Sequence, residues 1–265
     1  MVKIMVLVKQ VPDVSQVRFE GGKAPNLASI QAKMSDADKN ALEAAVQLKA
    51  AHAGSEVSVV TVGGPKVGET VNEALAIGGD KAFIVQQPHD KLDARATSEL
   101  LAAAIRKAGA HDLVLCGEAS TDAYQAQIGP RVAELLKLPQ ITFAKTVAID
   151  GSAVVATREL GDKEQKVRAD FPALVALVKD ANQPRLPNLM AIMGAKKKPQ
   201  TTWKPSDLGI NDADMAVEKL AVQAVEMRPQ KMDRKMEVLK DKPVEEAAAR
   251  VVEELQKRAV LVGGN

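Results

Sequence analysis

The stretch 112–139, DLVLCGEASTDAYQAQIGPRVAELLKLP, decides the fold of this chain. It begins with a short apolar run at 113–116 that ends at Gly117. A polar loop follows, and apolar residues then recur at helical spacing from 126 to 136. Strand, glycine turn, polar loop and helix form one unit of a parallel α/β sheet, where ligands bind at the carboxyl ends of strands. Ordinary βα connections have the same pattern, so both readings stay open at this point.

The same alternation fills residues 1–140. Apolar runs at 2–9, 56–62, 80–86 and 113–116 predict strands, and periodic segments at 36–53, 67–77, 93–108 and 126–136 predict helices, the first with Ser35 as its N-cap. From 141 to 178, short β segments at 141–143, 145–149, 153–160, 164–169 and 171–178 are separated by Asp150-Gly151 and Gly161-Asp162, which are hairpin signals. We therefore predict an open, mostly parallel, doubly wound sheet with an added antiparallel β meander.

The chain changes character after residue 181. Five prolines interrupt the region from 184 to 229, and a final helix at 244–258 has one apolar face. This predicts an α/β domain over 1–181 and an extended C-terminal arm with a terminal helix over 182–265. Such a helix packs either on its own domain or on a partner, and the sequence alone favours neither.

Composition excludes several classes of function. Only 2% of the 265 residues are aromatic, which argues against a base-stacking nucleic-acid platform. The 36 basic and 34 acidic residues nearly balance, so no polyanion partner is indicated. No apolar stretch is long enough to span a bilayer, and no signal peptide is visible, so we expect a cytoplasmic protein without membrane insertion. The single cysteine, Cys116, is expected to be a buried, inert thiol.

The chain also lacks the common catalytic and metal-binding motifs. It has no phosphate-binding G-x-x-x-x-G-K-[ST] loop, no H-E-x-x-H, no C-x-x-C and no G-x-S-x-G. We therefore expect no catalytic residue and no metal ligand, and a binding or carrier protein is favoured over a hydrolase or transferase. Asp36 and Asp38 precede a helix, where they serve either to compensate the helix dipole or to contact a nucleotide.

These features match one family over essentially the whole chain. The sequence resembles the β subunit of electron transfer flavoprotein, a group that includes the FixA-type proteins. Four segments carry the resemblance: VLVKQVPD at 6–13, MSDADKNALEAAVQLK at 34–49, ALAIGGDKA at 74–82 with its continuation LVLCGEASTDAYQAQIGPRVAELLKLPQ at 113–140, and NQPRLPNLMAIMGAKKK at 182–198 with WKPSDLGI at 203–210. The last segment is the most specific, because strand–loop–helix patterns recur widely and this tail does not.

The resemblance implies an adenine-nucleotide α-hydrolase-like fold and an αβ heterodimer. Such a heterodimer carries electrons from flavin dehydrogenases, or from NADH, to a quinone- or ferredoxin-linked acceptor such as a quinone oxidoreductase. The redox FAD is held mainly by the α subunit, and the β subunit holds AMP or, in electron-bifurcating members, a second FAD. The sequence does not decide between the two, nor whether the chain takes part in NADH oxidation. A stand-alone adenine-nucleotide-binding regulatory module is the alternative.

The resemblance also implies the site residues. The nucleotide pocket would use the end of the first strand, the start of the first helix, the glycines after the second strand and the loop that follows Gly117. The residues are Leu7, Val8, Ser35, Asp36, Ala37, Asp38, Gly63, Gly64, Gly117, Glu118, Ala119, Ser120, Thr121, Asp122, Gln125, Gln127, Ile128 and Gly129. The phosphate is expected to meet the amides of a helix that starts near Ala126, with help from the Ser120 and Thr121 hydroxyls.

Two departures from the family pattern accompany this assignment. Ser35 to Asp38 stand where the family usually has Asn-Pro followed by an aromatic residue and then Cys or Asp. Leu189 stands where the family has the leucine of a loop that docks into a dehydrogenase, but Leu186-Pro187 follows Arg185 where an aromatic residue is common. Leu189 is therefore either the partner-docking residue or a plain apolar contact of the tail.

Overall fold

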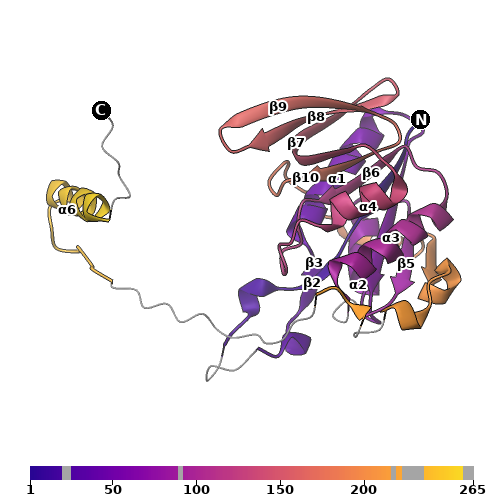
Figure 1. The fold of residues 1–265 in the computed structure, drawn as a ribbon, viewed down its shortest axis with the longest axis horizontal. Helices are drawn as coiled ribbons and strands as arrows, with labels where there is room; N and C mark the ends of the chain where they lie inside the picture. Colours follow the sequence, from indigo (N-terminus) through magenta and orange to yellow (C-terminus); the bar gives the residue numbers. More distant parts are fainter. Residues whose placement is uncertain (20–24, 89–91, 216–218, 223–235, 259–265) are drawn as a thin grey trace. The chain divides into compact units, whose positions relative to one another are not determined.

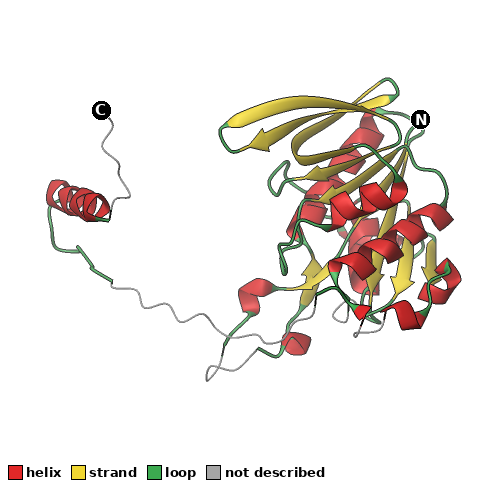
Figure 2. Cartoon of the chain, viewed as in Figure 1, coloured by secondary structure: helices red, strands yellow, loops and turns green. Residues whose placement is uncertain are grey.

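A computed structural model describes residues 1–19, 25–88, 92–215, 219–222 and 236–258 of the chain (Figure 1). The chain divides into two units, Met1–Met227 and Arg228–Asn265, and each is described by itself. The first unit contains a nine-stranded sheet with helices on both faces (Figure 2). None of the described helices has the length and apolarity needed to cross a membrane.

The sheet has the order β11-β5-β4-β1-β6-β10-β7-β8-β9. Strands β11 to β7 in this order pair in parallel, and β7, β8 and β9 pair antiparallel. The predicted doubly wound sheet with an antiparallel meander is therefore confirmed. The strands are β1 (Lys3–Leu7), β4 (Glu56–Gly63), β5 (Lys81–Gln86), β6 (Leu113–Gly117), β7 (Gln140–Asp150), β8 (Ala153–Leu160), β9 (Lys163–Asp170), β10 (Ala173–Leu177) and β11 (Gln200–Trp203), with β2 (Gln10–Pro12) and β3 (Ala32–Met34) forming a separate pair.

Two apolar clusters fill the space between the sheet and its helices. Alternate side chains of β1 enter different clusters: Ile4 and Val6 join the side of α1 (Asp36–Ala51) and α2 (Gly68–Ile77), and Met5 and Leu7 join the side of α3 (Ala94–Ala108) and α4 (Ile128–Leu136). Because both faces of the central strands are buried, these strands read as continuous apolar runs in the sequence.

Three local predictions differ from the structure. Helix α4 begins at Ile128 rather than near Ala126, because Tyr124 and Ala126 have φ angles of 49° and 53°, which no α-helix accommodates. Ser35 occupies the N-cap of α1, but its side chain makes no capping hydrogen bond. The segments predicted at 141–143 and 145–149 form one strand, β7, whose register shifts between Ala144 and Thr146.

The α/β unit also extends past the predicted boundary at residue 181. Strand β11 pairs in parallel with β5 and forms one edge of the large sheet, and the Trp203 ring stacks on Phe83 with centroids 5.1 Å apart. The short helix α5 (Leu189–Ala195) packs on α2. In the second unit, the terminal helix α6 (Val244–Lys257) forms as predicted, whereas 216–218, 223–235 and 259–265 of the expected arm lie outside the described residues.

Candidate functional site

The sheet has a topological switch point at β1. From β1 the chain moves through β4 to β5 on one side, and it then returns to place β6 on the other side of β1. The connections that leave β1 and β6 therefore diverge, and such a crevice is the usual ligand position in an open α/β sheet. A cleft of about 620 Å³ lies there, with Leu7, Val8, Val62 and Gly117 at the strand ends. We call it the switch-point cleft.

Ten of the predicted nucleotide residues line the switch-point cleft: Leu7, Val8, Asp38, Gly117, Glu118, Ala119, Ser120, Gln125, Gln127 and Ile128. Eight others do not line it: Ser35, Asp36, Ala37, Gly63, Gly64, Thr121, Asp122 and Gly129. The structure adds lining residues that the sequence did not indicate, among them Lys9, Asp93, Arg95, Arg131 and the segment 220–222. Some of these come from other elements, which become neighbours only in the folded chain.

Asp38 joins the two strands that flank the cleft. Its side chain is buried and accepts hydrogen bonds from the backbone N–H of Lys9 (2.8 Å) and of Gly117 (3.2 Å). Burial raises the pKa of this carboxyl to about 7, against the opposing effect of the two backbone donors and the Lys9 charge. Asp38 therefore links the ends of both strands and also lines the cleft, and its contact with a nucleotide stays a prediction.

This burial predicts a pH dependence of stability. The folded-state pKa of Asp38 lies above its ordinary 3.8, so folding takes up a proton between 3.8 and about 7. The stabilisation is complete below the ordinary pKa and is lost as the pH rises through about 7, with a size on the order of 4 kcal/mol. Urea unfolding of the nucleotide-free chain is expected to show this fall, and Asp38→Asn to flatten it. An equal slope in both proteins would contradict the assignment.

A charged pair closes the rim of the cleft next to Asp38. Lys9 Nζ lies 2.8 Å from Asp122 and 3.3 Å from Ser120 Oγ. Burial alone would raise the pKa of Asp122, but the charge and hydrogen bonds of Lys9 outweigh it and lower that pKa. Lys9 thus ties the end of β1 to the loop after β6, and Asp122 serves this contact rather than lining the cleft.

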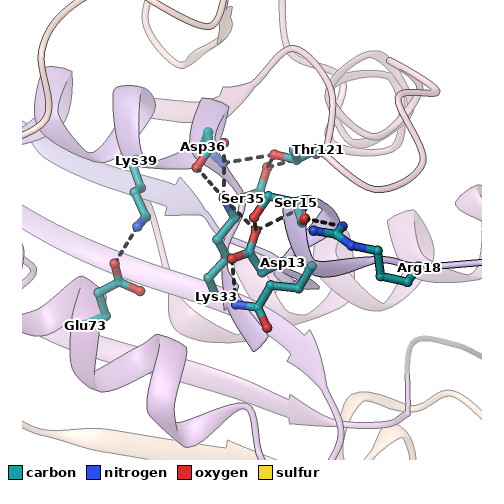
Figure 3. A network of polar contacts seen from close by, with 10 residues as sticks. Asp13, Ser15, Arg18, Lys33, Ser35, Asp36, Lys39, Glu73 and Thr121 are labelled. Atoms are coloured by element: carbon teal, nitrogen blue, oxygen red, sulfur yellow. Dashed lines mark hydrogen bonds and ion pairs between the residues drawn. The ribbon is translucent and has the colours of Figure 1, made fainter. Parts of the chain in front are cut away.

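Ser35, Asp36 and Thr121 form a polar network beside the cleft (Figure 3). The backbone N–H of Asp36 donates to Thr121 Oγ1 (3.1 Å), and the N–H of Thr121 donates to Ser35 Oγ (3.3 Å). The Asp36 carboxylate lies 3.3 Å from Lys33 Nζ, which also approaches Asp13 at 3.6 Å. The Thr121 hydroxyl accepts the hydrogen bond from Asp36 at the start of α1 and does not line the cleft, and its contact with a phosphate stays a prediction. These residues therefore support the site from outside.

Three of the described helices, α1, α3 and α4, contribute residues of their first turns to the cleft, and at two of them a side chain accepts a hydrogen bond from the N-terminal N–H groups. Thr121 caps α1, and Asp93 caps α3 by accepting from Ala96 N (2.8 Å). The other Asp93 oxygen accepts from Ala221 N (2.7 Å), which holds the segment 220–222 at the rim. At α4 no side chain of the described residues caps the helix, and Gln127, which stands at the N-cap, accepts from Arg131 Nε (3.1 Å). The start of α4 is therefore free to bind an anion.

Two of the predicted glycines act through packing. A Cβ on Gly117 would lie 2.7 Å from both Asp38 Oδ1 and Ala37 Cβ, so only glycine lets the end of β6 approach α1. A Cβ on Gly129 would lie 3.0 Å from Cys116 Sγ, so the absence of a side chain at Gly129 lets α4 lie close to β6. Burial raises the pKa of the Cys116 thiol, and the negative charge of Asp38 adds a smaller effect in the same direction. This agrees with an inert cysteine.

Leu189 lies apart from the cleft, in an exposed apolar group on α5 and the turn before it. Its side chain is 71% exposed, and Leu186 is 94% exposed. We call this group the α5 patch; its members are Leu186, Leu189, Met190, Ile192 and Met193. Contiguous exposed apolar side chains are typical of a protein-interaction surface.

These features define a doubly wound α/β protein with a ligand-sized cleft at its switch point. The electron transfer flavoprotein domain matches residues 27–208. The chain is 33% identical over 255 residues to an electron transfer flavoprotein subunit beta of Clostridium acetobutylicum, covering 96% of this chain and 97% of that protein. It is 34% identical over 211 residues to the caffeyl-CoA reductase-Etf complex subunit CarD of Acetobacterium woodii, covering 79% and 80%. The chain belongs to the electron transfer flavoprotein family, as a β-subunit-like electron transfer protein.

Proposed function

We propose that this chain is the β subunit of an αβ electron transfer flavoprotein and holds an adenine nucleotide in the switch-point cleft. The uncapped start of α4, next to Arg131, is the observation that supports this best. Orphan N–H groups at a helix N-terminus bind phosphate, and a guanidinium adds a charge-assisted donor. Leu7, Val8 and Val62 supply an apolar floor for the base at the other side of the cleft. The donor set therefore fits an adenine nucleotide.

The nucleotide is AMP or the adenylate part of a second FAD. AMP would be structural, whereas FAD would supply redox chemistry between an electron donor and an acceptor. In either case the residues of this chain bind and orient the group: Asp38 and Lys9 hold the strand ends in place, and α4 meets the phosphate. The redox FAD of the heterodimer belongs mainly to the α subunit. One relative is named as a subunit of a caffeyl-CoA reductase-Etf complex, which supports a redox enzyme as the electron-transfer partner, and we propose that this enzyme is a flavin dehydrogenase.

The α5 patch is the proposed docking surface for that dehydrogenase, with Leu189 as its central residue. Exposed Leu and Met side chains bury well in a partner's pocket, and Met adapts its shape to it. This patch and the apolar face of α6 favour an electron-transfer subunit over a stand-alone regulatory module, because a stand-alone module requires neither surface.

Co-expression with the α subunit tests the function. We expect the two chains to purify together with a flavin absorbance spectrum, and the denatured complex to release adenine nucleotide. One FAD with one AMP would identify a simple carrier, and two FAD would identify a bifurcating one. A colourless monomer that retains ATP would contradict the proposal and favour the regulatory module.

Arg131→Gln tests the phosphate site in particular. Loss of one charge-assisted hydrogen bond costs roughly 1.5–3 kcal/mol, so AMP affinity is expected to fall at least tenfold. Isothermal titration of the nucleotide-free complex measures the change. Arg106→Gln is the matched control, because Arg106 lies on α3 outside the cleft and donates to Leu135 O. Equal affinities in the wild type and Arg131→Gln would place the phosphate elsewhere.

A further inference from the structure

The segment that leads into α5 is fastened to α1 by four polar side chains. Asn40 Nδ2 donates to the Asn182 carbonyl (2.7 Å), and Asn182 Nδ2 donates back to the Asn40 carbonyl (2.9 Å). Arg185 donates to Glu43 through Nε (2.7 Å), Nη2 (2.9 Å) and its backbone N–H (3.2 Å). We call Asn40, Glu43, Asn182 and Arg185 the α1 clamp.

The α1 clamp places a polar and a charged side chain out of contact with water, which has an unfavourable desolvation free energy. The Glu43 side chain is only 4% exposed, and Asn40 is buried too. Burial alone would raise the pKa of Glu43, but the Arg185 hydrogen bonds outweigh it and lower that pKa, so the pair is ionised. Burying a carboxylate is unfavourable because the group loses its hydration. A buried ion pair can nevertheless serve to fix one conformation of the chain. Here the conformation that it fixes is that of the segment 182–185.

A second anchor holds the far end of α5. Ala195 is fully buried, and Lys198 Nζ donates to the carbonyls of Leu75 (2.7 Å) and Gly79 (2.6 Å) at the end of α2. Within the segment, the Asn188 side chain caps α5 by accepting from Ala191 N (2.9 Å). The chain is therefore fixed before and after the α5 patch, while the patch itself stays exposed.

We propose that Glu43 and Arg185 are positioning residues that preorganise the α5 patch for docking. Leu186 directly follows Arg185. The bidentate Glu43–Arg185 pair therefore sets the direction in which the segment after residue 185 extends from the surface of α1. A partner that binds an ordered patch loses less conformational entropy than one that must order a loop. Arg185 meets Glu43 through a planar fork, so lysine cannot replace it. The docking consequence rests on the function proposed above, whereas the ordering of the segment does not.

Hydrogen exchange of the purified chain tests the ordering without requiring the proposed partner. In Glu43→Gln we expect the amides of residues 186–195 to exchange at least tenfold faster than in the wild type. In Arg185→Lys the same amides should exchange nearly as fast as in Glu43→Gln. Arg185 is 47% exposed, so Arg185→Lys keeps the test available if Glu43→Gln fails to fold. Ile105→Val is the control for general destabilisation, since Ile105 is buried on α3 at the opposite face of the sheet. Unchanged exchange in both clamp variants would overturn the proposal.

Steady-state electron transfer tests the docking consequence, using a flavin dehydrogenase that reduces the wild-type complex. Glu43→Gln is expected to raise the KM for the complex about tenfold with little change in kcat, and to add almost nothing in a Leu189→Ala background. A normal KM in Leu189→Ala would refute the α5 patch as the docking surface. The hydrogen-exchange result would then still decide whether the α1 clamp orders the segment. The positioning role of Glu43 would be refuted by a raised KM in Leu189→Ala together with a normal KM in Glu43→Gln, if the amides of Glu43→Gln do exchange faster.

Discussion

Gly117→Ala is expected to remove the adenine nucleotide that we propose for the switch-point cleft, with at least a tenfold loss of co-purified nucleotide. The added Cβ would lie 2.7 Å from Asp38 Oδ1 and 2.9 Å from the Ala37 carbonyl carbon, so the start of α1 must move away from β6. That movement breaks the Gly117–Asp38 hydrogen bond and opens the floor of the switch-point cleft. Overpacking of this kind also costs about 1–3 kcal/mol of stability. Nucleotide extraction and thermal unfolding measure the two effects.

Gly68→Ala is the control for this substitution. Gly68 is the first residue of α2, and a Cβ there would meet nothing within 4 Å. Alanine in a helix restricts the unfolded chain, so stability should be unchanged or slightly raised, and the nucleotide should remain. Normal nucleotide content in Gly117→Ala would show that the cleft is not the binding site.

Charging the apolar face of α6 is expected to separate the chain from the α subunit that we propose as its partner. Val251 and Val252 are 51% and 45% exposed on a helix that buries no residue within its own unit. If this face packs on the partner, as we propose, Val251→Asp with Val252→Asp removes roughly 3 kcal/mol of apolar burial, which is about a hundredfold in affinity. Size-exclusion chromatography of the co-expressed chains measures the loss.

Glu246 lies on the opposite face of α6, so the variant Glu246→Gln serves as the control. Its ion pair with Lys242 is exposed, so its removal should leave the complex intact. Thermal unfolding of the unit Met1–Met227 should be the same in all three proteins, because the substituted residues belong to the other unit. An intact complex in the doubly charged variant would contradict the predicted packing of this helix on the partner.

The layered fold could be predicted because buried parallel strands leave a strong apolar signal. Strand β11 could not, since it is four residues long and lies between Pro199 and Pro205. Its pairing with β5 depends on residues more than a hundred positions earlier in the sequence. The start of α4 was placed too early for a different reason: Tyr124 and Ala126 adopt positive φ angles that only glycine would have signalled.

The lining of the switch-point cleft was predicted in part, and one cause explains why the other expected residues do not line it. The resemblance indicated the loop after Gly117, but it did not separate residues that face the cleft from those that support it. Thr121 and Asp122 face α1 and Lys9 instead of the cleft. The clamp residues Asn40 and Glu43 did leave a signal, as polar residues among the apolar positions of α1. Their partners are 142 positions away, so the meaning of that signal appears only in the folded chain.

Photolabelling of the intact αβ complex with 8-azido-AMP tests the central claim most directly. The labelled chain is digested, and the modified peptides are identified by mass spectrometry. We predict labels on the peptides that contain residues 7–9 or 117–128 of this chain, with loss of label when excess AMP is present. Labels confined to the α subunit, or to peptides outside the switch-point cleft, would contradict the account.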